Sequence, residues 1–255
     1  MATYTFLDAG SSPAGHELLI SIDSLEDPRF TDRGPPVYVR RRCTLYILRQ
    51  RVPIMKLNWV ERIVANNPLR ATLQRGEIHL LRERVQLQKG AKILEVGCGR
   101  GAGARLILGS FQPSLLCALD LDLRMVQKAR AYLSTDEGKR VSLYVGDVFR
   151  LPFKNNVLDA VFGFGVLHHV QDWRGAAAEI ARVLKSGGIY FVEEFYPSAY
   201  QNFITKHLLV HPRGDRFFSQ DLRDALEMLK LPVKDAIDFK KIGIVAVAVK
   251  EGSSG

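Results

Sequence analysis

Cysteine is scarce in this chain, and so are long apolar runs. Its 255 residues include only three cysteines, Cys43, Cys98 and Cys117, and no two of them have the Cys-x-x-Cys spacing. This usage argues against a disulfide framework and against a metal site, and it favours a reducing compartment. No stretch has the apolar length of a membrane-spanning helix, and the first residues lack the basic and then apolar order of a signal peptide. We therefore expect a soluble, cytoplasmic protein that holds no metal.

Acidic residues are absent from residues 33–60, although Lys and Arg are frequent there. The whole chain has a formal net charge of +9, so this segment could attract phosphates or an anionic membrane surface. It lacks the aromatic and glycine signature of an RNA-binding module, and a solvated basic connector is the simpler interpretation. We expect no nucleic-acid partner. Weak membrane-surface contact through residues 33–56 stays open, as does the oligomeric state.

The chain divides near residue 55. The segment before it is predicted to be a partly irregular amino-terminal extension, because its first part is rich in Gly, Ser, Pro and Asp. Two apolar stripes at helical spacing follow, and the second consists of Ile78, Leu81 and Val85. They predict two helices that act as a lid beside a ligand site. The expected organisation is an extension over residues 1–54, a helical lid over 55–90, a ligand-binding domain over 91–250 and a flexible tail over 251–255.

From residue 92 onward, predicted strands and helices alternate, which is typical of a doubly wound parallel sheet. Helices are expected after the glycines that follow the first strand, over 123–133 with Asp122 as N-cap, over 176–185, and after Ser219. The predicted fold class is α/β, a doubly wound, seven-stranded, Rossmann-like sheet with a closing antiparallel strand, plus the amino-terminal helices. The strands are expected at residues 92–96, 115–120, 141–147, 157–165, 189–194, 236–242 and 244–249.

A glycine-rich turn after the first of these strands is the most informative motif. Gly97, Gly99, Gly101 and Gly103 alternate with other residues, so the backbone can adopt positive φ angles and a ligand can lie directly against it. Glu95, two residues before the first glycine, would repel a pyrophosphate through like charge. The turn therefore predicts a nucleotide-like ligand that is cationic rather than anionic near Glu95.

Two more acids lie where later strands end. Asp120 closes the second strand and could accept two hydrogen bonds from a ribose diol. Asp147 follows the third strand, where its carboxylate and the next backbone amide could read one edge of an adenine. Acids at strand ends often only cap the next helix, but three acids in this order favour a nucleoside ligand.

These motifs resemble those of class I methyltransferases that use S-adenosylmethionine (SAM), in particular the type 11 group. The resemblance covers residues 93–249 and includes Gly146-Asp147-Val148 and Leu167-His168-His169-Val170. It implies a SAM-dependent methyltransferase with a small-molecule acceptor, in which Glu95 and the glycine loop contact the amino acid part of SAM, Asp120 the ribose and Asp147 the adenine. The cofactor-binding residues that we expect are Glu95, Gly97, Cys98, Gly99, Gly101, Asp120, Leu121, Gly146, Asp147, Val148, Gly163 and Phe164.

Two other functions stay open. Gly97, Gly99 and Ala102 formally satisfy the dinucleotide-binding fingerprint of an NAD(P)-dependent oxidoreductase, but that function leaves Glu95 and Asp147 unexplained. A catalytically silent SAM-binding protein on the same scaffold is the second alternative. Quinone methyltransferases of the type 11 group usually carry Phe-Gly-x-Arg-Asn at the fourth strand, whereas residues 164–168 read Phe-Gly-Val-Leu-His here. This departure puts a quinone acceptor in doubt.

His168 and His169 follow the fourth strand at the mouth of the expected crevice. An imidazole with a near-neutral pKa could deprotonate an acceptor, so these two are the candidate catalytic residues. Neighbours on an extended chain point to opposite sides, which favours His169 as the residue that reaches the acceptor. Packing or a structural hydrogen bond is the alternative role. Glu193, Glu194 and Tyr196 are further candidates.

The acceptor is expected to be selected by the amino-terminal helices and by the insert over residues 195–218. The insert is rich in apolar side chains, which favours a hydrophobic or aromatic small molecule. Burial of the same side chains against the core explains them equally well. They are Tyr196, Tyr200, Phe203, Ile204, Leu208, Leu209, Phe217 and Phe218. The sequence does not set whether O, N or C is methylated.

Overall fold

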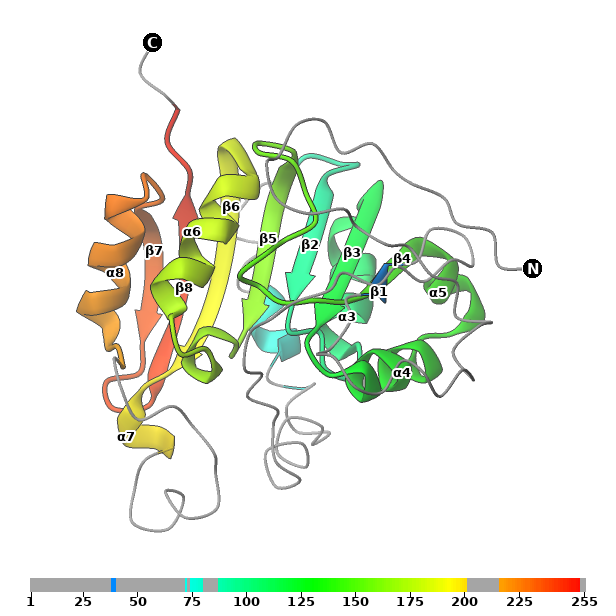
Figure 1. Cartoon of the computed structure of the whole chain (residues 1–255), viewed down its shortest axis with the longest axis horizontal. Coiled ribbons are helices and arrows are strands. Elements are labelled where there is room, and N and C mark those ends of the chain that lie inside the picture. Colours follow the sequence, from blue (N-terminus) through cyan, green and yellow to red (C-terminus); the bar gives the residue numbers. More distant parts are fainter. Residues whose placement is uncertain (1–37, 40–71, 73, 80–86, 201–215, 253–255) are drawn as a thin grey trace, which may run out of the picture.

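The structure is a computed structural model that describes residues 38–39, 72, 74–79, 87–200 and 216–252. These residues form one mixed sheet with helices on both faces (Figure 1). The strands are β1 (Tyr38–Val39), β2 (Lys92–Val96), β3 (Leu115–Asp120), β4 (Val141–Val145), β5 (Leu158–Phe164), β6 (Leu184–Phe195), β7 (Val233–Asp238) and β8 (Gly243–Val249). The helices are α3 (Ala102–Phe111), α4 (Leu123–Tyr132), α5 (Thr135–Arg140), α6 (Trp173–Val183), α7 (Pro197–Tyr200) and α8 (Ser219–Met228), with the 3₁₀ helix η3 (Leu167–His169).

The strand order across the sheet is β1-β4-β3-β2-β5-β6-β8-β7. Strands β4, β3, β2, β5 and β6 run parallel to one another, whereas β8 is antiparallel to both β6 and β7. The chain first adds strands on one side of β2 and then returns to add strands on the other side, as doubly wound folds do. The predicted fold class, with its closing antiparallel strands, is confirmed.

The structure differs from the predicted elements in several places, among them β1, β7 and α5. β1 adds an eighth strand at the edge, where Tyr38 pairs with Val145 of β4 in antiparallel register. β7 ends at Asp238 rather than at residue 242, because the Ile242 amide donates to the Phe239 carbonyl at 3.0 Å in a tight turn. The short helix α5 was not predicted from apolar periodicity, since it buries none of its residues and begins with a capping box.

Little of the predicted lid lies within the described residues. Residues 74–79 are helical, as predicted for the second lid helix, and Ile78 is buried at 2% exposure in the core. Leu81 and Val85 lie outside the described residues, and so does the basic stretch 33–56 apart from β1. The boundaries of the extension, the lid and the tail therefore stay predictions.

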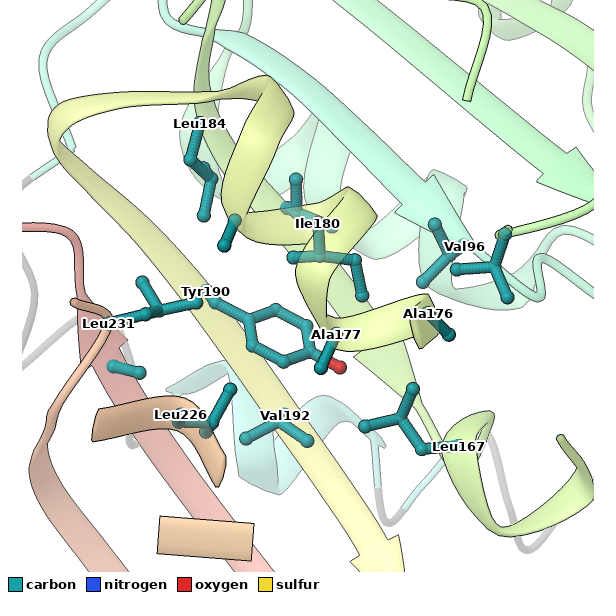
Figure 2. Packing of buried hydrophobic residues seen from close by; sticks show 14 of the residues in the cluster. Val96, Leu167, Ala176, Ala177, Ile180, Leu184, Tyr190, Val192, Leu226 and Leu231 are labelled. Carbon is teal, nitrogen blue, oxygen red and sulfur yellow. The ribbon is translucent and has the colours of Figure 1, made fainter. Parts of the chain in front are cut away.

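The alternation of side chains divides the core between the two faces of the sheet. On β2, Leu94 belongs to the cluster beneath α6 and α8, whereas Ile93 belongs to the cluster beneath α3 and α4. Figure 2 shows the first cluster, where the ring of Tyr190 on β6 lies near Ala177 of α6. Glu95 has the parity of Ile93, so its side chain lies on the α3 side of the sheet. A carboxylate is thereby directed from a core strand toward the start of a helix.

Candidate functional site

The carboxyl ends of β2 and β5 are neighbours at the point where the strand order reverses. β2 pairs with β3 on one side and with β5 on the other. Open α/β sheets bind ligands outside this switch point. The turns after β2, β3, β4 and β5 all leave the sheet at this edge, so side chains from four separate segments can converge on one ligand.

The glycine loop after β2 has a backbone that other residues avoid. Gly97, Gly99 and Gly101 have φ angles of 69°, 52° and 87°, in the left-handed region that favours glycine. A Cβ atom on Gly97 would lie 2.5 Å from Cγ2 of Val166, in the turn after β5, so these two turns touch. A Cβ atom on Gly99 would meet no atom of the described residues within 4 Å. The loop is thus packed at its start and open at Gly99, where a ligand can approach the backbone.

Glu95 lies beneath the amino-terminal end of α3. Its carboxylate contacts Gly103, where any Cβ atom would collide with it, and it accepts a hydrogen bond from the Ala104 amide. Glu95 is 1% exposed, and its Oε2 is buried without a hydrogen-bond partner among the described residues. Burial, followed by the nearby charge of Asp120, raises the pKa of Glu95 well above its usual range. A cation placed against Oε2 would satisfy this oxygen and stabilise its ionised form.

Asp120, the last residue of β3, is hydrogen-bonded to the glycine loop. Its Oδ2 accepts from the Gly99 amide at 2.9 Å, and its Oδ1 accepts from the Asp122 amide at 2.9 Å. Burial raises the pKa of Asp120 to about 6, although both of these hydrogen bonds act in the opposite direction. A carboxylate has about four acceptor positions, so a hydroxyl donor can still bind to this one.

Asp147 lies in the turn after β4 and is tied to the same edge. It is 9% exposed, its Oδ1 accepts from the Phe149 amide at 3.0 Å, and burial raises its pKa. The amide of its neighbour Gly146 donates to the Asp120 carbonyl at 3.0 Å. This bond joins the turn after β4 to the end of β3, so one extended ligand could contact both acids.

The other predicted cofactor-binding residues fall into two groups. Some lie in the turns themselves, and these are Cys98, Leu121 and Val148. Gly163 and Phe164 instead form the end of β5, where the ring of Phe164 lies 5.4 Å from the ring of Phe191. Phe164 is 7% exposed, so packing in the core already accounts for it.

His168 and His169 do not lie on an extended chain. They belong to η3, and the centroids of their rings are 4.1 Å apart. The prediction that their side chains point to opposite sides is therefore wrong, because β5 ends at Phe164 and the chain turns at Gly165, which has a φ of 70°. His168 is buried at 5% exposure, and His169 is more exposed. This difference, rather than strand alternation, now favours His169 as the residue that reaches an acceptor, and its role stays a prediction.

Glu194, next to the last residue of β6, anchors the backbone of this turn. Its Oε1 accepts from the amides of Val166 and Leu167 at 3.0 and 2.7 Å, and its Oε2 accepts from the His168 amide at 3.1 Å. The Nδ1 atom of His168 lies 2.7 Å from the same Oε2. With an ionised Glu194, Nδ1 donates this hydrogen bond, which fixes the orientation of the His168 ring.

Arg216 holds the other side of the same turn. Its guanidinium donates to the carbonyl oxygens of His168 and Val170 at 2.9 and 3.2 Å. Arg216 also forms a hydrogen bond with the side chain of Tyr200. The ring of Tyr200 stacks on that of His168, with the ring centroids 5.4 Å apart. No motif or periodic pattern in the sequence marks Arg216, because its position depends on contacts between segments far apart in the chain.

The apolar insert is core in part. Tyr196, Tyr200 and Phe217 are buried, and the ring of Phe217 lies 4.5 Å from that of Trp173 in α6. Phe218 is 49% exposed. Burial against the core, one of the two interpretations of this insert, is thus confirmed for three of its apolar residues. The remaining four, Phe203, Ile204, Leu208 and Leu209, lie outside the described residues.

Known proteins share both the motifs and the fold. Residues 94–192 match the family described as a methyltransferase domain. The sterol 24-C-methyltransferase erg6 of Aspergillus fumigatus is 31% identical over 148 residues, which are 57% of this chain and 39% of that relative. A SAM-dependent methyltransferase from Aquifex aeolicus superimposes with a TM-score of 0.61 at 17% identity, over 76% of this chain and 99% of that one. The cyclase SpnF superimposes with a TM-score of 0.57 at 19% identity, over 69% of this chain and 81% of that one.

The similarity to the methyltransferase domain family covers residues 94–192 of this chain. The structural neighbours show that the described residues have the Rossmann-like fold of SAM-dependent methyltransferases such as that from Aquifex aeolicus. The chain spans only 31% to 39% of the length of the curated relatives it matches. One structural neighbour is a cyclase, so the fold by itself does not define the reaction.

The residues present fit SAM. SAM carries a sulfonium and an ammonium group, and the buried Oε2 of Glu95, which has no hydrogen-bond partner among the described residues, can accept such a cation. The open backbone at Gly99 provides room beside it. In the part of the chain that the structure describes, no cluster of His, Cys, Asp and Glu could hold a metal ion. None of the described helices combines the length and apolarity needed to span a bilayer.

Proposed function

We propose that this protein is a SAM-dependent methyltransferase that transfers a methyl group from SAM to a small, hydrophobic or aromatic acceptor. One observation carries the proposal: the Glu95 carboxylate is buried beside the glycine loop, with Oε2 lacking a partner among the described residues. The ionised form of Glu95 would repel a pyrophosphate at this loop, because the two charges have the same sign. An amino acid cation would place opposite charge there.

Three acids would hold the cofactor through three different groups. Glu95 and the loop from Gly97 to Gly101 would receive the amino acid part, Asp120 the ribose hydroxyls, and Asp147 the adenine amine. The hydrogen bonds from Gly99 to Asp120 and from Gly146 to Asp120 support this assignment, because they fix the three segments relative to one another. Bound SAM supplies a methyl group that is already activated, so the protein mainly has to orient the acceptor.

The side chains also have to remove one proton from the acceptor. We assign its removal from the acceptor to His169, the more exposed of the two histidines. His168 would support this role through η3, where Glu194 fixes the orientation of its ring and its backbone. The ring of Phe195 meets that of His168 edge-on at 5.6 Å, and the His168 ring lies 4.1 Å from that of His169, so aromatic side chains lie close to the candidate base.

An apolar acceptor fits these aromatic surroundings. The similarity to a sterol 24-C-methyltransferase supports a hydrophobic acceptor, although it covers only 57% of this chain. We propose a small molecule rather than a nucleic acid as the acceptor. We also propose a cytoplasmic location, because Cys98 and Cys117 are buried and form no disulfide among the described residues.

Incubation of the protein with methyl-labelled SAM and a metabolite extract tests the proposal. Calorimetry should first give a stoichiometry of one for SAM, and the incubated extract should then contain a labelled product that the His169→Ala variant forms more slowly. SAM binding without any labelled product would instead identify a catalytically silent binding protein. Tight NADH binding without SAM binding would contradict the proposal as a whole.

A further inference from the structure

The turn between β7 and β8 exposes apolar side chains on both sides of a basic pair. It reads Phe239-Lys240-Lys241-Ile242, and all four residues are exposed, with Phe239 at 50% and Ile242 at 58%. The Phe239 amide donates to the Gly243 carbonyl at 2.8 Å, and the Ile242 amide donates back to the Phe239 carbonyl at 3.0 Å. These bonds close a tight turn in which the two apolar side chains flank the two lysines.

Phe218 extends this apolar surface. Its ring lies 5.5 Å from the ring of Tyr196, and the Tyr196 amide donates to the Ile242 carbonyl at 2.9 Å. The Tyr196 hydroxyl group donates to Asp238 at 2.9 Å, so the acid that precedes the turn is already hydrogen-bonded within the protein. We call Phe218 together with residues 239–242 the basic-apolar tip.

The tip lies at the same edge of the sheet as the candidate site. β8 begins at Gly243, which pairs with Phe195 at the carboxyl end of β6, and β6 runs parallel to β5 and β2. Figure 1 shows the β7–β8 turn beside α7, at the end of the sheet where the parallel strands finish. The other large exposed apolar side chains of the described residues lie elsewhere, Leu115 at the start of β3 and Met228 at the end of α8.

We propose that the basic-apolar tip docks the protein onto an anionic membrane surface, with Phe239 and Ile242 inserted among the lipids and Lys240 and Lys241 at the headgroups. Exposed apolar side chains beside lysines are the combination that binds such an interface, because apolar burial and attraction to anionic lipid add together. Charge complementarity selects lipid as the occupant: a second copy of this chain, with its net charge of +9, would bring like charge to the tip. Docking at this edge would turn the candidate site toward the bilayer, and this consequence for a hydrophobic acceptor rests on the proposed function.

Sedimentation with vesicles tests the docking. The full chain should bind vesicles of phosphatidylcholine in which phosphatidylserine is about a third of the lipid, and bind pure phosphatidylcholine vesicles much more weakly. The double variant Phe239→Ser/Ile242→Ser should lower the partition coefficient at least about tenfold, and Lys240→Gln/Lys241→Gln should lower it by a similar factor. The matched control is Met228→Ser, which removes a side chain that is 77% exposed at the end of α8 and should leave binding within about twofold.

Three outcomes would overturn the docking proposal. The wild-type chain could fail to bind the anionic vesicles, or both tip variants could bind as well as the wild type, which would assign binding to residues 33–56. The tip variants could instead change the oligomeric state in the absence of lipid, which would make a second copy the occupant. SAM binding, measured on every variant, confirms that the variants fold and separates failure of docking from failure of the proposed function.

Discussion

The Nδ1 atom of His168 lies 2.7 Å from Oε2 of Glu194, a carboxylate that also accepts three backbone amides of the turn from Val166 to His168. Glu194 is 1% exposed, so these four donors replace the water that a buried carboxylate loses. One side chain on β6 thereby fixes both the path of the chain after β5 and the orientation of a histidine. The turn that carries the candidate base is built in advance of any ligand.

Replacing Glu194 should therefore loosen this turn. The Glu194→Gln variant replaces one of the two accepting oxygens by an NH2 group, so at least one of the four donors loses its partner. We expect a loss of about 1.5–3 kcal/mol in the free energy of unfolding, the scale of hydrogen bonds to a charged group. Urea unfolding measures it, and Glu227→Gln, at an exposed position of α8, is the control that should change by less than about 0.5 kcal/mol. Equal effects in the two variants would show that Glu194 does not anchor the turn.

The two histidines should differ in kinetics. His169→Ala is expected to lower turnover at least about tenfold while SAM affinity stays within about threefold, the pattern of an interaction made only in the transition state. His168→Ala should also lower the free energy of unfolding, because it leaves the buried Glu194 carboxylate without one donor. Small and equal losses of turnover in both variants would mean that the pair is structural.

SAM affinity should depend on pH through Asp120. Its pKa is raised to about 6, so the carboxylate is ionised above that pH and protonated below it. Only the ionised form accepts charge-assisted hydrogen bonds from the ribose, and a cation near Glu95 favours ionisation there as well. We expect the affinity to fall about threefold to tenfold between pH 7 and pH 5. Calorimetry at both pH values measures this, and Asp120→Asn should bind SAM more weakly, with a flatter pH dependence.

Substitution of two glycines of α3 by alanine should change the free energy of unfolding in opposite directions. Gly103→Ala would drive a Cβ atom into the Glu95 carboxylate, and we expect a loss of about 1–3 kcal/mol in the free energy of unfolding together with weaker SAM binding. Gly109, also in α3, is exposed with open space around its missing Cβ, so Gly109→Ala should stabilise by about 0.5–1 kcal/mol. Urea unfolding of both variants measures these changes. An unchanged free energy of unfolding in Gly103→Ala would contradict the placement of Glu95.

Features that depend on residues close together in the sequence, such as helix caps and glycine turns, could be predicted. Asp122 was expected to cap α4, and its Oδ1 accepts from the Arg124 amide at 2.9 Å. The glycine loop and the acids at the ends of β2 and β3 could likewise be predicted, because a strand end or a positive φ angle is indicated by the residue types within a few positions of it.

Features that depend on distant contacts could not be predicted in this way. The turn at His168 is fixed by Glu194 on another strand, and the residues of the turn itself do not indicate that partner. The end of β7 was misplaced because Phe239 and Ile242 are apolar and read as strand residues, although they lie exposed in a turn. Their exposure is the same property that makes the tip a candidate docking surface.

The Glu95 carboxylate is the centre of this account, and one calorimetric comparison tests it most directly. SAM and methylthioadenosine share the nucleoside, but methylthioadenosine lacks the amino acid part and the positive charge. The Glu95→Gln variant should bind SAM at least about tenfold more weakly than the wild type, the scale of a lost charge-assisted hydrogen bond, and bind methylthioadenosine within about threefold of it. Equal losses for the two ligands, or unchanged SAM affinity, would show that Glu95 does not receive the cationic end of the cofactor.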